Sequence, residues 1–164
     1  MIKQFDTYSL LPHNTFGIEA KATHFVEFTS VADICNFLGN GFNGKSLVIG
    51  GGSNLLFVKD FNGTVFHSAI KDIEIVDETD SEILLRVGSV MNWDELVAYT
   101  VEKGWCGLEN LSLIPGEVGA SAVQNVGAYG VEAGDHIETV ETIRIADAVV
   151  CSFTKSDCDF AYRH

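Results

Sequence analysis

The sequence has few basic residues. Ten lysines and arginines stand against 23 acidic residues, which gives a formal net charge of −13. Proteins that bind nucleic acid need a basic face to neutralise phosphates, so nucleic acid is not an expected partner. An anionic membrane surface is disfavoured for the same reason. A negatively charged substrate would also be repelled overall, so a site for one needs a local positive charge.

Long apolar runs and paired cysteines are also missing. No stretch approaches the roughly 20 apolar residues of a membrane-spanning helix, and the first ten residues lack the apolar core of a signal peptide. The four cysteines form no C-x-x-C pair and the five histidines are scattered. This spacing indicates neither a disulfide framework nor a metal site. We expect a cytoplasmic protein with reduced thiols.

Hydrophobic periodicity predicts a mixture of strands and helices. Strands are expected at residues 23–28, 46–49, 63–67, 73–76, 83–87, 137–145 and 149–153. Helices are expected at Ser30–Asn40 and Asn92–Lys103, each beginning at a residue that can cap a helix N-terminus. No proline-rich linker divides the chain, and we place a boundary near Ser68–Ile70. The pattern indicates an α+β protein with lobes at residues 1–68 and 69–164, although periodicity alone does not separate this fold from other α/β arrangements.

The stretch from Gly107 to Gly130 is rich in glycine and poor in charge. Its sequence is GLENLSLIPGEVGASAVQNVGAYG, and its polar side chains are mostly short or uncharged. Glycine is retained where the chain takes positive φ or where a ligand approaches the backbone closely. A packed core would contain more branched apolar residues, and an ordinary surface loop would carry more charge. This composition is typical of a backbone that wraps a large, flat ligand with polar edges.

A second glycine-rich segment follows the short strand expected at residues 46–49. It reads Gly50-Gly51-Gly52-Ser53-Asn54. Consecutive amides in such a turn can point at one anion, and Ser and Asn side chains add hydrogen-bond donors, so a diphosphate would fit. The segment is neither a Walker phosphate loop nor a Rossmann fingerprint. By itself, it is also compatible with a tight loop between two strands.

Several short motifs occur along the chain in a characteristic order. They are Asn14–Gly17 (NTFG), Gly50–Leu56 (GGGSNLL), Gly107–Glu109 (GLE), Ile114–Gly116 (IPG), Gly119, Gln124–Asn125, Gly127–Gly130 (GAYG) and Tyr162–Arg163. Together they resemble the UDP-N-acetylenolpyruvoylglucosamine reductase family (the MurB family). One departure is Ala122, where many family members carry proline before the Gln-Asn pair.

The resemblance implies a two-lobed FAD-binding fold of the vanillyl-alcohol-oxidase type, with the cofactor between the lobes. It also implies that NADPH reduces FAD, and that the reduced flavin passes hydride to the enolpyruvyl group of a UDP-sugar to give UDP-N-acetylmuramate. FAD supplies the difficult chemistry and the protein supplies position and electrostatics. The expected cofactor-binding residues are Gly50, Gly51, Gly52, Ser53, Asn54, Leu55, Gly119, Ala120, Ser121, Gln124, Asn125 and Gly127.

Some of these residues have two possible roles. Amides near Gly119–Ser121 would favour an anion if a helical turn starts there. Gln124 and Asn125 either hydrogen-bond the flavin edge or hold the loop in shape. Tyr129 is expected to border the flavin and the substrate, with a half-buried core position as the alternative.

Tyr162 and Arg163 match a family pair near the enolpyruvyl group. Hydride delivery leaves negative charge that extends into the neighbouring carboxylate. A guanidinium can meet that charge with two hydrogen bonds and stays protonated, so we expect Arg163 to be catalytic. The alternative is an ordinary surface arginine.

The family's pattern continues past Tyr162–Arg163 into a substrate-binding C-terminal domain, whereas this chain stops at His164. The family's serine proton donor and a late glutamate lie in that domain. We therefore expect an FAD-binding half that does not turn over alone. Two other hypotheses stay open: a different flavin oxidoreductase of the same fold, such as an oxidase with covalent flavin, and a non-catalytic binding domain whose glycine loops are structural only.

Overall fold

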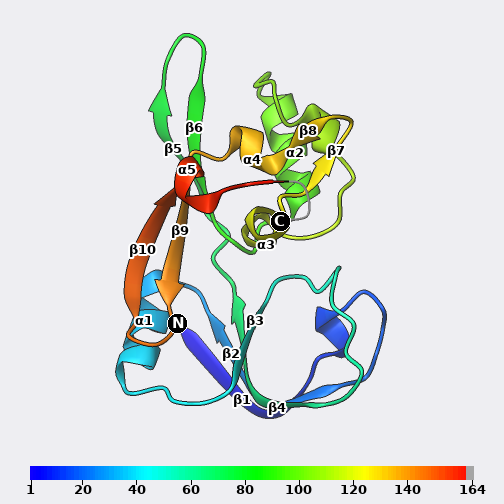
Figure 1. The fold of residues 1–164 in the computed structure, drawn as a ribbon, viewed down its shortest axis with the longest axis vertical. Helices are drawn as coiled ribbons and strands as arrows, with labels where there is room; N and C mark the ends of the chain where they lie inside the picture. Colours follow the sequence, from blue (N-terminus) through cyan, green and yellow to red (C-terminus); the bar gives the residue numbers. More distant parts are fainter. Residues whose placement is uncertain (162–164) are drawn as a thin grey trace. The chain divides into compact units, whose positions relative to one another are not determined.

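The computed structural model describes residues 1–161, and the chain divides into two compact units. The first unit contains Met1–Ala69 and also Glu141–Cys151, while the second contains Ile70–Val140 and the chain from Ser152 onward. Figure 1 follows the chain through its elements. The sequence predicted a second lobe at residues 69–164, which would include Glu141–Cys151. The return of the chain to the first unit at these residues leaves no local signal in the sequence.

The first unit is built on a four-stranded mixed sheet in the order β1-β2-β4-β3. The strands are β1 (Ile2–Ser9), β2 (Lys21–Phe28), β3 (Ser46–Ile49) and β4 (Phe61–Ser68). β1 runs antiparallel to β2, whereas β4 is parallel to both β2 and β3. Phe25 of β2 lies opposite Val65 of β4, and Val26 lies opposite Phe66. Because successive side chains point to opposite faces of a sheet, each of these pairs lies on a different face.

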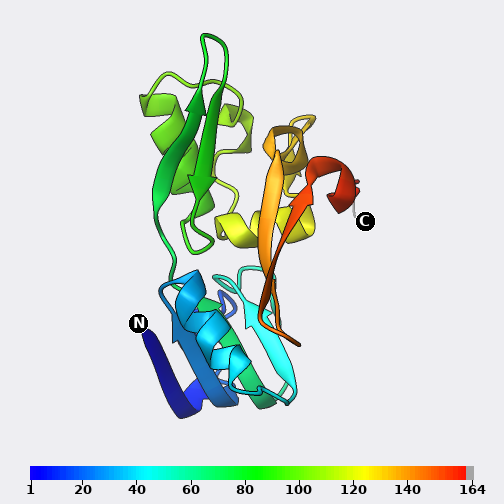
Figure 2. The ribbon, with the colours of Figure 1, turned by 90° about the vertical axis from the view of Figure 1, so that its left-hand side faces the viewer.

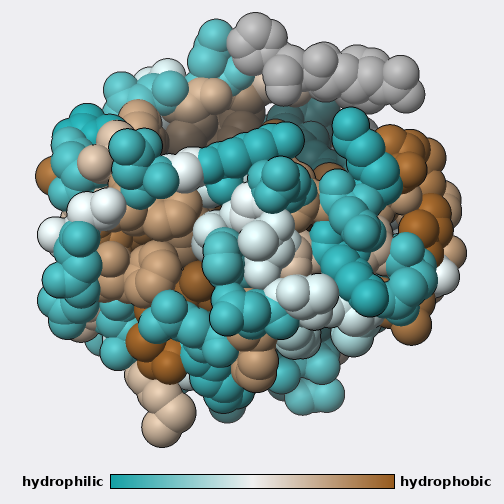
Figure 3. Space-filling view, turned by 90° about the horizontal axis from the view of Figure 1, so that it is seen from below, coloured by the Kyte–Doolittle hydropathy of each residue, from teal (hydrophilic) through white to brown (hydrophobic). Residues whose placement is uncertain are grey.

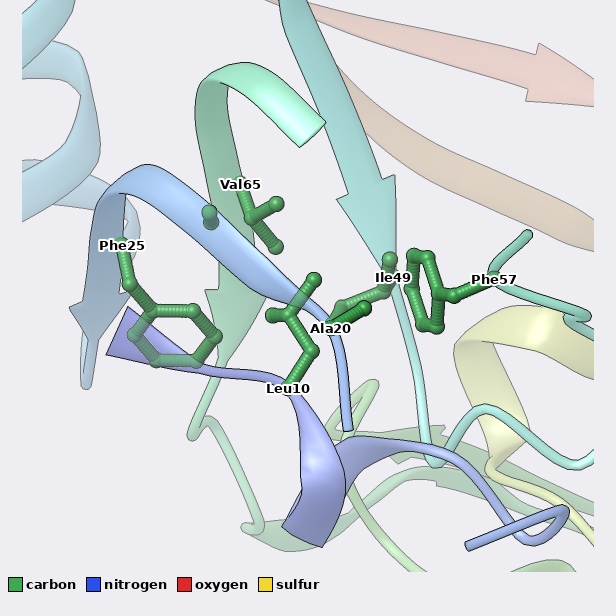
Figure 4. Close-up of a cluster of buried hydrophobic side chains, with 7 residues drawn as sticks. Leu10, Ala20, Phe25, Ile49, Phe57 and Val65 are labelled. Atoms are coloured by element: carbon green, nitrogen blue, oxygen red, sulfur yellow. The ribbon is translucent and has the colours of Figure 1, made fainter. Parts of the chain in front are cut away.

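The two faces of this sheet are covered differently. Figure 4 shows the apolar cluster on one face, which consists of Leu10, Ala20, Ala22, Phe25, Ile49, Phe57 and Val65. Leu10 and Phe57 in this cluster come from irregular segments, the first preceding β2 and the second following β3. The helix α1 (Val31–Gly39) lies across the sheet in Figure 2, and the ring of Phe37 on this helix packs edge-on against Phe66. As expected, Ser30 caps this helix by accepting a hydrogen bond from the Asp33 amide (3.1 Å).

The second unit packs around helix α2 (Trp93–Glu102). Its other elements are the hairpin of β5 (Ile73–Glu78) and β6 (Ile83–Val87), the 3-10 turn η2 (Glu109–Leu111), α3 (Val118–Gln124), the short hairpin of β7 (Gly127–Ala128) and β8 (Val131–Glu132), α4 (Ala133–His136) and α5 (Lys155–Cys158). The buried core consists of Met91, Trp93, Leu96, Val97, Leu111 and Ala133. Asn92 caps α2 by accepting from the Asp94 and Glu95 amides, as its sequence predicts.

A long hairpin of β9 (Thr139–Arg144) and β10 (Val149–Thr154) has residues in both units. All the strands and both helices expected from periodicity are present, within a few residues at each end. β1 and the 3-10 turn η1 (Leu11–His13) were not anticipated. Most of β1 is exposed, so its sequence carries no alternation, and it is a strand because it pairs with β2.

Polar residues cover most of the face shown in Figure 3, with smaller apolar patches between them. Within residues 1–161, no helix is both long enough and apolar enough to cross a membrane. The same residues contain no group of three or more His, Cys, Asp or Glu side chains placed to hold a metal ion, and all four cysteines are free.

Candidate functional site

The glycine turn of the first unit follows the carboxyl end of β3, a strand parallel to its neighbour β4. Ligands of open α/β sheets bind outside the carboxyl ends of their parallel strands. Within the turn, Gly52 is buried, Asn54 is exposed and Gly50, Gly51, Ser53 and Leu55 are partly buried. The turn therefore reaches from the protein interior to solvent over a few residues that have little side-chain bulk.

Gly52 is required by close packing against another loop. Its φ is +67°, and an added Cβ would lie only 1.9 Å from the His13 carbonyl oxygen and 2.9 Å from the Asn14 Cα. The Thr15 amide also donates to the Gly52 carbonyl oxygen (3.3 Å). No L-amino-acid side chain fits in this position, so the glycine turn and the segment around Asn14 are shaped by one another.

Asn14 holds that second segment in place. It is only 6% exposed, and its side-chain amide donates to the carbonyl oxygens of Leu10 (2.8 Å) and Ile18 (3.0 Å). Its Oδ1 accepts from the Ile18 amide (2.9 Å). The NTFG motif therefore holds in place the backbone that packs against Gly52. The motif is one of those that carry the family resemblance, but the sequence alone did not indicate that it supports the glycine turn.

Aromatic and imidazole rings pack beneath the same segment. Tyr8 stacks on Phe25 with 4.1 Å between ring centroids, and its hydroxyl lies 3.3 Å from His13 Nε2. The His13 ring lies 4.8 Å from that of Phe25 and meets His67 edge-on at 4.7 Å. These contacts fix the position of His13, whose carbonyl oxygen contacts Gly52.

One carboxylate faces this ring cluster. Glu27 Oε1 accepts a hydrogen bond from Lys3 Nζ (2.7 Å), and Oε2 lies 3.7 Å from His67 Nδ1. The hydrogen bond from Lys3 is the main cause of a lowered pKa for Glu27, with smaller contributions from the charges of Lys3, His67 and His13. The Glu27 carboxylate therefore stays ionised at pH values below those at which a glutamate is ordinarily protonated.

In the second unit, Trp93 fastens the glycine-rich segment to the start of α2. Its indole Nε1 donates to the Leu111 carbonyl oxygen (2.9 Å), and its backbone amide donates to the Gly116 carbonyl oxygen (3.0 Å). The side chain is buried. The buried indole needs a hydrogen-bond acceptor, and the segment supplies one.

Asp94 fixes the tip of the same segment. Its Oδ1 accepts from the Ser112 hydroxyl (3.0 Å) and from the Leu113 amide (2.6 Å). Leu113 has φ of +62° and is 85% exposed. A large apolar side chain is thus held in a strained conformation and presented to solvent, an arrangement common at functional sites. Sequence reasoning assigned no role to either residue.

The start of α3 does not offer free amides to an anion. Its first four amides donate to carbonyl oxygens, in the pairs Val118 to Met91 (2.9 Å), Gly119 to Ser89 (3.0 Å), Ala120 to Glu117 (3.0 Å) and Ser121 to Glu117 (3.0 Å). An added Cβ on Gly119 would lie 2.7 Å from Ser89 Cβ. Ser121 is 3% exposed and donates to the Val118 carbonyl oxygen (2.7 Å). Each of these amides therefore already has a partner within the chain, and these hydrogen bonds do not favour the expected anion-attracting helix start.

Asn125 is bonded at both ends of its side chain. It ends α3 with φ of +43°, its Nδ2 donates to Glu132 Oε2 (2.5 Å), and its Oδ1 accepts from the Gly134 amide (2.8 Å). Of the two expected roles, these bonds favour holding the loop in shape. Gln124 and Gly127, by contrast, are exposed.

Tyr129 lies at the tip of the β7–β8 hairpin and is 89% exposed. The half-buried core position considered from the sequence is therefore wrong. Tyr129 and Gly130 have φ of +53° and +81°, as in the tight turns that join two short antiparallel strands. Tyr162 and Arg163, the other expected substrate residues, lie outside the residues that the structure describes.

Residues 22–153 match the family model described as FAD binding domain. The chain belongs to this family of FAD-binding domains. It is also 52% identical over 157 residues to the UDP-N-acetylenolpyruvoylglucosamine reductase of Bacteroides fragilis, covering 95% of this chain and 47% of that protein. To the Amoebophilus asiaticus protein of the same name, it is 48% identical over 152 residues, covering 92% of this chain and 45% of that protein.

The fold is similar to the crystal structure of UDP-N-acetylenolpyruvylglucosamine reductase (MurB) from Thermus caldophilus. The TM-score is 0.76 at 23% identity, covering 99% of this chain and 56% of that one. The expected α+β FAD-binding fold is confirmed, and so is the resemblance to the reductase family. The chain spans about half the length of the curated relatives that it matches.

Proposed function

We propose that this chain is the FAD-binding part of a UDP-N-acetylenolpyruvoylglucosamine reductase. In this proposal, the whole enzyme would use NADPH, with FAD as its bound cofactor, to reduce the enolpyruvyl group of a UDP-sugar and give UDP-N-acetylmuramate for peptidoglycan synthesis in the cytoplasm. The observation that carries the proposal is the 52% identity to a reductase of that name over 95% of the chain. The family match over residues 22–153 supports FAD independently.

The Gly50–Leu55 turn is the proposed diphosphate site. Its glycines leave the backbone open to a ligand, and Ser53 and Asn54 add polar side chains at its outer end. Neutral amide and hydroxyl donors suit a diphosphate in a chain whose net charge is −13, because few basic side chains are available. The residues present therefore fit the group chemically. When bound, FAD supplies the hydride-transfer chemistry.

In the second unit, the residues that we propose to serve the cofactor or the substrate are of two kinds. Gln124, Gly127 and Tyr129 are exposed, and we propose that they contact the flavin or the substrate. Gly119, Ala120, Ser121 and Asn125 are engaged in bonds within the protein, and we propose that they shape the backbone that the cofactor meets. Tyr162 and Arg163 complete the proposal as substrate residues, with the Arg163 guanidinium binding the substrate carboxylate.

Turnover is proposed to need more than this chain. Its curated relatives are about twice as long, and we propose that their remaining half provides the substrate-binding domain and the proton donor. The chain alone would then bind FAD without oxidising NADPH in response to the UDP-sugar. An NADPH-oxidation assay with that substrate would contradict this if the chain turned over at rates like those of its full-length relatives.

The direct test is titration of the chain with FAD, followed by flavin fluorescence and visible absorbance. We expect saturable binding that Ser53→Ala/Asn54→Ala weakens. The control is Asn43→Ala/Ser152→Ala, which truncates the same residue types at exposed positions elsewhere. Absence of binding by the unaltered chain would contradict the proposal and favour a non-catalytic domain. Flavin that stays attached after denaturation would favour an oxidase with covalent flavin.

A further inference from the structure

The side chains of Asn125 and Glu132 join the two ends of the β7–β8 hairpin. Asn125 precedes β7, Glu132 is the last residue of β8, and their side chains meet at 2.5 Å. Glu132 also accepts from the Asp135 backbone amide, while the Asp135 side chain accepts from the Glu132 amide (2.9 Å). The Asn125 Oδ1 accepts from the Gly134 amide (2.8 Å). One asparagine and one glutamate thus tie the end of α3, the hairpin and the start of α4 together.

Gly134 leaves the space that this arrangement needs. An added Cβ at Gly134 would lie 2.9 Å from Asn125 Oδ1 and 2.8 Å from the Phe160 ring. Gly134 is buried, so no water can take the place of the Asn125 acceptor at the Gly134 amide without a rearrangement. The asparagine itself sits in the left-handed region, which Asn tolerates better than most residues.

The hairpin closed by this pair carries the exposed Tyr129. Its two strands have two residues each, and such a small hairpin is not stable in isolation. Tyr129 has positive φ, an unfavourable conformation for a tyrosine that must be maintained by its surroundings. The Asn125–Glu132 hydrogen bond joins the residues that flank the hairpin, and therefore limits how the Tyr129 turn can move.

We propose that Asn125 and Glu132 are positioning residues that set the orientation of Tyr129 toward bound FAD. This inference rests on the proposed FAD binding. Of the two roles expected for Asn125, it takes the one that holds the loop in shape, and it makes Asn125 the support of a neighbouring contact. It assigns Glu132 a role that no sequence pattern indicated, since a lone glutamate in a loop resembles many solvated ones. The hydrogen bond between the two side chains can be reversed by exchanging the amide and the carboxylate, so that residue 132 donates and residue 125 accepts. The test uses this exchange.

The test compares Asn125→Asp with Asn125→Asp/Glu132→Gln. The single change keeps the shape, the left-handed conformation and the acceptor for Gly134, but places two carboxylates against each other. Losing a charge-assisted hydrogen bond in this way should weaken FAD binding by about tenfold to a hundredfold. In the double variant, the introduced glutamine amide can donate to the introduced aspartate, and the glutamine carbonyl oxygen can still accept from the Asp135 amide. We expect the affinity to return to within about threefold of the unaltered chain.

A second readout reports on Tyr129 itself. At saturating FAD, a tyrosine ring in contact with the flavin quenches its fluorescence. We expect Asn125→Asp to reduce this quenching, the double variant to restore it, and Tyr129→Leu to abolish it with or without the pair. Asn43→Asp, which adds the same charge at an exposed position, is the control. If Asn125→Asp does not fold, Glu132→Ala removes the bond by deletion and allows the same two measurements.

The outcomes separate this inference from the proposed function. No FAD binding by the unaltered chain contradicts the proposed function. Normal binding and quenching in Asn125→Asp overturns the inference alone. Equal loss in Asn125→Asp and in the folded double variant also overturns it, because an asparagine that contacts FAD directly cannot be rescued by a change at Glu132.

Discussion

Replacing Gly52 by alanine tests the packing between the glycine turn and the segment around Asn14. The new Cβ would lie 1.9 Å from the His13 carbonyl oxygen and 2.7 Å from its carbonyl carbon, and φ is +67°. A left-handed conformation costs an L-residue about 1–2 kcal/mol. Overlap with backbone atoms adds about 1–3 kcal/mol, the usual range for overpacking. The free energy of unfolding should therefore fall by about 2–5 kcal/mol.

Gly17→Ala is the matched control for this experiment. Gly17 has φ of +64°, nearly the same as Gly52, and an added Cβ there meets nothing within 4 Å. It should lose only the conformational part, about 1–2 kcal/mol. Urea unfolding followed by far-UV circular dichroism measures both variants, and the difference between them isolates the steric part.

The comparison can fail in a clear way. If Gly52→Ala is no less stable than Gly17→Ala, the two loops do not pack as closely as the structure shows. The glycine at position 52 would then be explained by conformation or by the ligand alone. A larger loss in Gly52→Ala, accompanied by weaker FAD binding, would support the view that the His13–Asn14 backbone shapes the proposed diphosphate turn.

Two further predictions concern the hydrogen bonds that anchor Ser112 and Leu113 to Asp94, and the ion pair of Lys3 with Glu27. Asp94→Ala removes the acceptor for Ser112 and Leu113 and should destabilise the chain by about 1–3 kcal/mol. Amide hydrogen exchange at Leu113 should become faster, and unchanged protection would refute the anchor. For the ion pair, Lys3 lowers the pKa of Glu27 below its ordinary 4.5, so the stabilisation is present above that pH and is lost as the pH falls through the lowered pKa. Lys3→Met should therefore flatten the loss of stability that urea titrations measure as the pH falls below about 4.5, and an unchanged slope would contradict the assignment.

Much of the local structure could be predicted from residues close together in the chain. Ser30 and Asn92 marked the starts of the two main helices because a side chain that caps a helix acts on amides two or three residues away. The strand at residues 46–49 and the glycine turn after it were also predicted correctly. The order of the short motifs was enough to indicate the family and the FAD-binding fold, which the comparisons confirmed.

Roles that depend on distant partners could not be predicted in this way. The Gly119 amide donates a hydrogen bond to the Ser89 carbonyl oxygen, and Gly52 packs against the His13 carbonyl group. No local sequence pattern links the residues of either pair. Asn125 looked equally suited to contacting flavin or to holding the loop, and its two hydrogen bonds within the chain became visible only in the folded structure.

The amino-acid sequence by itself determined where glycines and capping residues permit turns and helix starts, because those preferences act over a few bonds. Tertiary structure decided which of these positions remain open to a ligand and which are occupied by the protein. A backbone amide or a side-chain amide has the same chemistry in both cases, and only the partner brought to it by folding determines whether it can bind a cofactor.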